Sequence, residues 1–244
     1  MKQRCPVLLL LIFLSASVIG YSRQNDSLAK LDKHFSMRNA FYKADYKSRD
    51  GRSGSNGADR FAIVLFHMAK RGGHGKPGRS GPTLQVKVTA IPSGDSVILA
   101  IVVTKEGGKK TDHYYVNPRH GKIVIVADGG NGGSGGNGED GEEVTQKRPY
   151  GGSGGDGGRG ANGGAGGTIN VTFDSSAVSY INSPCILYFN QPGMGGNGGS
   201  GGRPTGTGSA DGSPGKSGES GRPGPPVTVT GPNGKVFRID AGRP

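Results

Sequence analysis

The chain has 244 residues, of which 49 are glycine and none is tryptophan, with a hydrophobic content of 32% and a formal net charge of +12. So low a hydrophobic content excludes a large conventional apolar core and is typical of disorder when glycine has no period. Here glycine returns at every third position over long stretches, so we expect an ordered repeat structure.

The first twenty residues have the features of a secretory signal peptide. Lys2 and Arg4 form a basic start, residues 7–14 an apolar run, and residues 15–20 are mostly small. The apolar run is too short to cross a bilayer, so we predict a secreted or cell-surface protein without a transmembrane segment. Cleavage after residue 20 would remove two cations, lowering the formal charge from +12 to +10. Cys185 would then be the single cysteine, which excludes an internal disulfide, and its apolar surroundings predict a buried thiol.

Residues 21–50 are polar and basic and are predicted to form a separate N-terminal segment. Its scattered apolar residues fit one side of a helix, and residues 43–49 have the composition of a linker. The helical stripe would comprise Leu28, Leu31, Phe35, Tyr42 and Tyr46.

Residues 51–244 are predicted to form one domain in which six glycine tracts alternate with β-strands. We number the tracts in chain order as 51–58, 72–82, 129–141, 151–167, 193–203 and 212–226. Glycine occupies one position in three in tracts 1, 2 and 6, and two positions in three in tracts 3, 4 and 5. The glycines that we expect to be structurally required in the latter are Gly129, Gly132, Gly135, Gly138, Gly151, Gly154, Gly157, Gly160, Gly163, Gly166, Gly196, Gly199 and Gly202.

A period of three matches the polyproline-II helix, which has three residues per turn and no internal hydrogen bonds. An edge of bare glycines lets a neighbouring backbone approach closely enough for hydrogen bonds between helices. Tracts 3, 4 and 5, with two bare edges, are therefore expected inside a bundle, and tracts 1, 2 and 6 at its periphery. Proline cannot donate a backbone hydrogen bond, and within the tracts it occurs only in tracts 2 and 6, which have a single glycine register, at Pro77 and Pro214 for example.

The segments between the tracts resemble short strands. Residues 84–89, 97–104, 113–116 and 122–127 predict a four-stranded meander. Further strands are expected at 61–68, 169–173 and 186–189, and residues 227–230 and 235–239 predict a hairpin that turns at Asn233-Gly234. The predicted fold class is therefore mainly β: a short-stranded antiparallel sandwich-like module combined with about six polyglycine-II helices, with little α-helix.

The order of tracts and strands also predicts how the bundle is connected. Tracts 2, 4 and 6 run into strands, whereas tracts 3 and 5 follow them. The connections at 142–150 and 203–211 should therefore meet at the end far from the β module, and the direction of tract 1 is left open.

The repeat chemistry resembles three known kinds of protein. Tract 6 resembles collagen, over about five triplets. Tracts 3, 4 and 5, with glycine at two positions in three, resemble the polyglycine-II bundles of snow flea antifreeze proteins, which are six-helix two-layer stacks. They also resemble the polyglycine-II bundles of tip adhesins on some phage tail fibres. The adhesin resemblance implies that distal loops bind a bacterial surface. The collagen resemblance implies a trimeric stalk, although the short triplet run favours a monomer.

No enzymatic motif accompanies these repeats. The tracts lack a phosphate-binding GxxxxGK[ST] loop, and the histidines lack metal-binding spacing. Asp140, Glu142 and Glu143 form an acidic cluster that could hold calcium, but the cluster lacks a spaced ligand loop and is better interpreted as a solvated turn. We therefore predict a non-catalytic protein without a cofactor.

The leading functional hypothesis is a structural or adhesive module that presents loops on a rigid glycine scaffold. Lys147, Arg148 and Tyr150 are the predicted binding residues, with two cations for anionic groups and one ring for stacking on sugars. The expected partner is an anionic polysaccharide or the cell envelope, not a nucleic acid. Two alternatives are a collagen-like trimer and an ice-binding protein. Ice would contact the non-glycine tract positions Asn131, Ser134, Asn137, Ser153, Asp156, Arg159 and Ala165.

Overall fold

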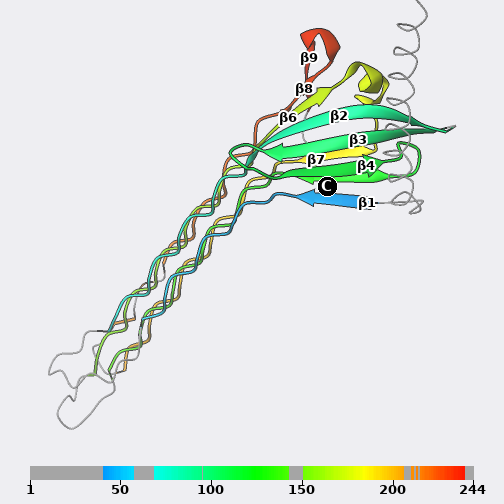
Figure 1. Ribbon diagram of the computed structural model, residues 1–244. Coiled ribbons are helices and arrows are strands. Elements are labelled where there is room, and N and C mark those ends of the chain that lie inside the picture. Colours follow the sequence, from blue (N-terminus) through cyan, green and yellow to red (C-terminus); the bar gives the residue numbers. More distant parts are fainter. Residues whose placement is uncertain are drawn as a thin grey trace, which may run out of the picture.

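The protein consists of a β module from which a long, thin rod of glycine tracts projects (Figure 1). This computed structural model describes residues 41–57, 69–94, 96–142, 151–205, 210–211, 213 and 215–239. The predicted signal peptide and the apolar run at 61–68 lie outside the described residues. The described part of the chain contains no helix with the length and apolarity that a membrane span requires.

One face of the β module is a sheet of three parallel strands in the order β1-β5-β7. These strands are β1 (Phe41–Asp45), β5 (Lys122–Val126) and β7 (Ile186–Phe189). The connections between them are long because each includes an excursion along the rod. Parallel strands need such crossover connections, since a tight turn can join only antiparallel neighbours.

The other face is a six-stranded mixed sheet in the order β4-β3-β2-β6-β8-β9. Its three central strands, β2 (Thr83–Ser93), β6 (Thr168–Phe173) and β8 (Val227–Thr230), pair in parallel. Three antiparallel strands flank them: β3 (Ser96–Lys105), β4 (Thr111–Val116) and β9 (Val236–Ile239). Two short 3-10 helices, η1 (Ser175–Tyr180) and η2 (Pro232–Gly234), occupy connections.

A single apolar core lies between the two sheets. Strand β2 shows why, because Leu84, Val86 and Val88 are buried while Gln85 and Lys87 are exposed. Ile123 and Ile125 of β5 belong to the same buried cluster, and so does Cys185, as expected for an inert thiol. The alternation of side chains along a strand explains how so few hydrophobic residues suffice for a two-layer core.

The strands lie close to where the sequence indicated, and the mainly β class is confirmed, but two predictions about pairing are wrong. Strands β2, β3 and β4 do form a meander, whereas β5 leaves it and joins the opposite sheet. The module is also not antiparallel throughout. The strands that connect directly to the rod pair with one another in parallel: β1, β5 and β7 in one sheet, and β2, β6 and β8 in the other.

From residue 41 onward the chain departs from the predicted helical stripe and linker, whereas Leu28, Leu31 and Phe35 of the stripe lie outside the described residues. Residues 41–45 form β1, which pairs with β5, so this part of the N-terminal segment belongs to the interleaved domain. Tyr42 packs edge-on against Tyr114 of β4, with ring centroids 5.7 Å apart. The Tyr46 hydroxyl donates a hydrogen bond to Asp112 at 2.8 Å, which ties the two sheets together. Burial of the Tyr46 hydroxyl raises its pKa, and its bond to Asp112 helps to lower the pKa of that carboxyl.

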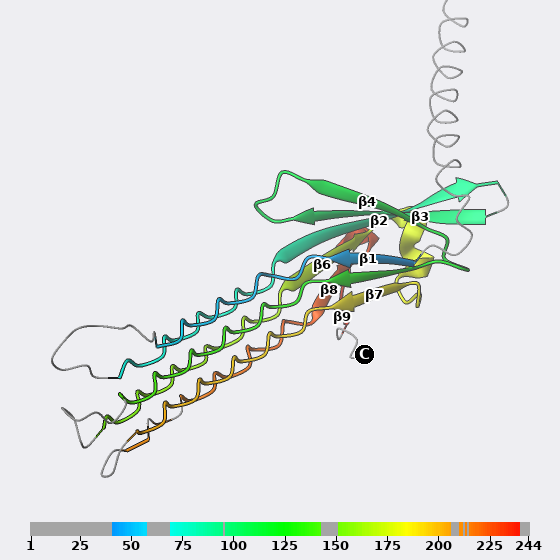
Figure 2. The same cartoon turned by 90° about the horizontal axis from the view of Figure 1, so that it is seen from below.

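Each layer of the rod is the direct continuation of one sheet. Strands β1, β5 and β7 lead outward into tracts 1, 3 and 5, and tracts 2, 4 and 6 lead back into β2, β6 and β8 (Figures 1 and 2). Tract 1, whose direction the sequence does not predict, therefore runs away from the β module like tracts 3 and 5.

Candidate functional site: the glycine rod and its distal end

The rod is a two-layer lattice held by backbone hydrogen bonds at every third residue. Within one layer, Gly51 and Gly54 of tract 1 donate to Asn131 and Ser134 of tract 3 at 2.7 and 2.8 Å, and tract 3 donates to tract 5 in the same way. The second layer repeats this from tract 2 to tract 4 to tract 6. Neighbours within a layer run parallel, whereas the two layers run antiparallel, as when Gly136 donates to Gly73 at 2.8 Å.

The close approach of backbones explains the glycine period. A Cβ on Gly132 or Gly157 would overlap a backbone carbonyl oxygen of the adjacent tract. The same holds for every glycine predicted to be required except Gly151, which instead has a φ of 62° at the start of tract 4. Glycine is therefore needed for space along the tracts and for backbone conformation at this one turn.

The number of glycine edges on a tract does not determine how many neighbours the tract has in the bundle, contrary to the prediction. Tracts 3 and 4 each hydrogen-bond to four others, tracts 2 and 5 to three, and tracts 1 and 6 to two. Tract 2 is therefore as enclosed as tract 5, although it has one bare register. The reason is directional: Cβ positions of a tract point toward the next tract in sequence and toward the tract two before it. Tract 2 has no tract two before it, so its second register can carry Lys76 and Arg79.

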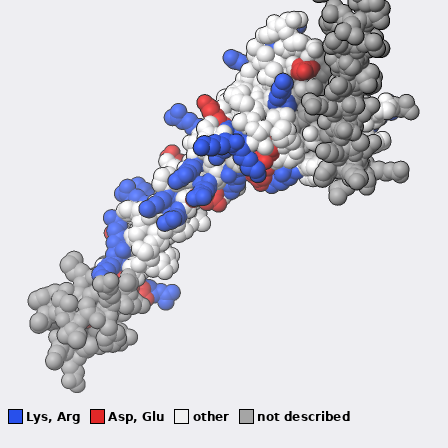
Figure 3. All heavy atoms as spheres, in the orientation of Figure 1, with Lys and Arg blue, Asp and Glu red and all other residues white. Residues whose placement is uncertain are grey.

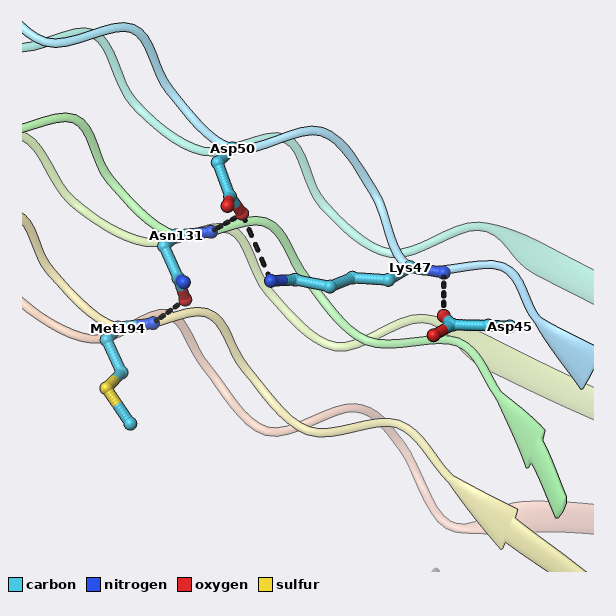
Figure 4. Close-up of polar contacts among 5 residues, drawn as sticks. All are labelled: Asp45, Lys47, Asp50, Asn131 and Met194. Atoms are coloured by element: carbon cyan, nitrogen blue, oxygen red, sulfur yellow. Dashed lines mark hydrogen bonds and ion pairs between the residues drawn. The ribbon is translucent and has the colours of Figure 1, made fainter. Parts of the chain in front are cut away.

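The non-glycine positions of tracts 3 and 4 carry out a structural task that the sequence did not reveal. Asn131, Asn137 and Arg159 donate their backbone N–H to a side chain of the preceding tract in the layer, and side chains of tracts 3 and 4 accept in turn from amides of tracts 5 and 6. Asn131 N–H donates to Asp50 Oδ1 at 2.7 Å, and Asn131 Oδ1 accepts from Met194 N–H at 2.9 Å (Figure 4). Comparable bonds are made by the acceptors Asn56, His74, Asp128, Asn137, Asp140, Ser153, Asp156 and Asn162.

These bonds form rows across each layer and influence local electrostatics. The Asn131 amide, assisted by Lys47 at 3.2 Å, lowers the pKa of Asp50 (Figure 4). Each of these bonds satisfies an amide that would otherwise face water, so the asparagine, aspartate and serine side chains that accept them stabilise the lattice itself.

The distal end of the rod brings together the connections between successive tracts. Gly57 donates to Asn137 and Glu139 donates to Lys70, which places both ends of the 58–68 connection there. Gly152 donates to Glu142, and Gly154 donates to Ala210, which brings the other two connections to the same end, as predicted. The predicted binding residues Lys147, Arg148 and Tyr150 lie outside the described residues.

A shallow hollow of about 310 Å³ lies beside these connections, on the outer side of tracts 1, 3 and 5. Buried Glu139 accepts a hydrogen bond from Lys70 N–H at 2.7 Å, and Asp140 accepts one from Arg203 N–H at 2.7 Å. Glu139 stands where the glycine register of tract 3 would place another glycine. Its backbone N and Cβ lie beside Gly57, the last described residue of tract 1.

The sequence predicts that the acidic cluster at this end is a solvated turn and not a calcium site. Asp140 caps a backbone amide, and Glu143 lies outside the described residues. Over the described ranges, no group of three or more His, Cys, Asp or Glu side chains is placed to hold a metal ion.

Comparison with known proteins adds no relative: no protein-family model matches the chain, and neither do the curated proteins or the solved structures.

Proposed function

We propose that this is a non-catalytic structural or adhesive protein whose six tracts form a polyglycine-II bundle that carries binding loops away from the β module. The observation that supports this best is the hydrogen-bond lattice. The donors to any one neighbouring tract recur at every third residue, and no backbone hydrogen bond forms within a tract over the described residues. Both features are those of polyproline-II-type helices.

The lattice supports a rigid spacer because the tracts brace one another on several sides. Glycine loses about 0.5–1 kcal/mol more conformational free energy on ordering than alanine, and a net hydrogen bond returns about 1 kcal/mol. An isolated tract would therefore be marginal. Here tracts 3 and 4 are bonded on four sides, and all six tracts are anchored in the sheets.

The bundle can be tested by amide hydrogen exchange followed by NMR. In tract 1 the amides of Gly51 and Gly54 are bonded to tract 3, whereas Arg52 and Ser53 have no backbone acceptor within the described structure. We expect slow exchange at one amide in three in tract 1. In tract 3 we expect it at three consecutive amides, those of Gly129, Gly130 and Asn131. Uniformly fast exchange along both tracts would contradict the bundle.

The adhesive function can be tested by co-sedimentation of the protein with bacterial envelopes across a salt series. In this proposal the 142–150 connection contacts the anionic surface through Lys147, Arg148 and Tyr150. We expect saturable binding at physiological salt, and its loss on replacing all three residues with alanine. Unchanged binding by that variant would refute the role of the loop.

The two alternatives gain no support from the described residues. In tract 6, Gly215 and Gly218 donate hydrogen bonds to tract 5, and a Cβ at either position would contact tract 4. The glycine edge that a collagen-like triple helix would require is therefore already packed against the rod. The outward positions predicted to contact ice include Asp156 and Arg159, and several of them bond laterally to the backbone, so they do not present a flat layer of small, unengaged groups.

A further inference from the structure

The two long edges of the rod differ in charge. Tracts 1 and 2 are the end members of their layers on one side and bond to each other there. Five exposed cations follow this side, and we call them the basic edge: Arg49, Arg52, Lys70, Lys76 and Arg79. Lys and Arg side chains are visible along the rod in the space-filling view (Figure 3).

The opposite edge, formed by tracts 5 and 6, has fewer cations, and the exposed charges of tract 6 have both signs: Lys216, Glu219 and Arg222. Gly195 and Gly198 of tract 5 face tract 6, and Gly198 N–H donates to Ser217 Oγ at 3.5 Å. Ser220 and Pro223 continue the row of Ser217 at intervals of three residues. The row of Ser217, Ser220 and Pro223 has no charge, so the rod carries more positive charge along tracts 1 and 2 than along tracts 5 and 6.

The cations of the basic edge form a ladder. Arg79 N–H donates to the Arg49 carbonyl at 3.2 Å, and Lys76 N–H donates to the Arg52 carbonyl at 2.8 Å, so these cations are paired along the two backbones. Successive pairs are three residues apart, which is about 9 Å in a helix that rises about 3.1 Å per residue.

The ladder is held in place by the lattice behind it. Gly51 donates to Asn131 and Gly78 donates to Asn162, so both backbones are fixed from the inner side. Binding a ligand would therefore reduce the conformational entropy of the side chains but not that of the backbone, which is already ordered.

The basic edge is also free to pair with an external anion. None of its five side chains makes an ion pair or hydrogen bond with another described residue. The nearby acids are engaged elsewhere: Asp50 pairs with Lys47 and accepts from Asn131, and Glu139 accepts from the backbone of Lys70.

We propose that the basic edge binds a linear acidic polysaccharide lengthwise along the rod. The inference rests on the proposed adhesive function and adds a contact surface distinct from the distal loops. Evenly spaced, preorganised cations fit a polymer with repeating carboxylate or sulfate groups, and guanidinium groups can pair with such anions through two hydrogen bonds. Residues 49–57 and 70–81 contain no Phe, Tyr or Trp, so this edge lacks the stacking platforms that bind single-stranded nucleic acid.

The test compares two variants that lose the same charge. The edge variant is Arg49→Gln, Arg52→Gln, Lys76→Gln and Arg79→Gln. The control variant is Lys87→Gln, Lys105→Gln, Lys109→Gln and Lys122→Gln, all at exposed positions of the β module. Binding to immobilised heparin and polygalacturonate, as sulfated and carboxylated probes, is measured at physiological salt by interferometry. Melting curves verify that both variants fold.

We expect the edge variant to bind at least about tenfold more weakly, as four exposed ion pairs of a few-fold each would give, and the control to bind within about twofold of the wild type. Three results would overturn the proposal: no polysaccharide binding by the wild type, equal loss in both variants, or full binding by the edge variant. Tighter edge-dependent binding of duplex DNA than of either polysaccharide would also overturn it. The Lys147→Ala, Arg148→Ala, Tyr150→Ala variant, assayed on envelopes, tests the loop separately, so either assignment can fail alone.

Discussion

A methyl group added to a central tract should destabilise the whole protein. Gly158 of tract 4 faces tract 2, and a Cβ there would overlap the Gly73 carbonyl oxygen and lie 2.6 Å from its carbon. Ordinary contact begins at 3.4 Å, so the tracts must separate by at least 0.8 Å. The flanking bonds from Gly72 to Asp156 and from Gly75 to Arg159, each 2.8 Å, would then stretch to about 3.6 Å, beyond hydrogen-bonding distance.

Losing two net hydrogen bonds at about 1 kcal/mol each, and leaving their groups poorly paired, costs about 2–4 kcal/mol. The smaller conformational freedom of alanine in the unfolded chain returns about 0.4–1 kcal/mol. For Gly158→Ala we therefore expect a net loss near 2 kcal/mol, which lowers the melting temperature by about 4–8 °C for a chain of this size.

The assay is thermal unfolding followed by circular dichroism, with Gly231→Ala as the matched control. Gly231 has a φ of −86°, and its Cβ would have its nearest neighbour at an ordinary 3.7 Å. The control should melt at the wild-type temperature or slightly above. A Gly158→Ala variant that melts with the wild type would refute the claim that the tracts are in backbone contact.

Three further predictions concern single side chains. Asn131→Ala removes the acceptor of the Met194 amide and should lower stability by about 1 kcal/mol in chemical denaturation, whereas Ser134→Ala, which removes no hydrogen bond between described residues, should be neutral. Because the folded-state pKa of Asp50 is lowered, its charged form stabilises the protein above about pH 4, and this contribution disappears as the pH falls through the folded-state value. Asp50→Asn keeps an acceptor but cannot titrate, so melting temperatures between pH 3 and 7 should fall less steeply with acid than in the wild type; an unchanged slope would exclude a role for Asp50. The Tyr188 hydroxyl is buried without a hydrogen-bond partner in the described structure, so Tyr188→Phe should raise the melting temperature, and a lower one would indicate a bond at that hydroxyl.

Some features of the rod followed from residue types alone. A period of three in glycine, uninterrupted by proline wherever two registers are bare, predicted six tracts and the meeting of their connections at one end. The alternation of apolar residues at 84–88 and 169–173 predicted strands of the β module, because the two-residue period of a strand is a local property of the backbone. The Asn233-Gly234 hairpin followed for the same reason, and both residues have a φ of 70°.

Other features depended on partners distant in sequence. The pattern of β5 is equally compatible with either sheet. It joins β1 and β7 because all three strands lead outward into one layer of the rod. The strand at 41–45 was missed because its pairing partner lies about eighty residues later, with Phe41 opposite Lys122. The apolar run at 61–68 and the loop that holds Lys147, Arg148 and Tyr150 lie outside the described residues, so both remain predictions.

The sequence by itself determined the repeat, its interruptions and the positions of the strands, since these depend on backbone geometry over a few residues. Only the tertiary structure decided which tracts lie side by side, why tract 2 needs one bare register, and what Asn131 and its counterparts do. Those side chains accept hydrogen bonds from amides 57 to 85 residues away in the chain. The order of the layers alone creates these contacts, and it also brings Arg49 and Arg52 opposite Lys76 and Arg79 to form the basic edge.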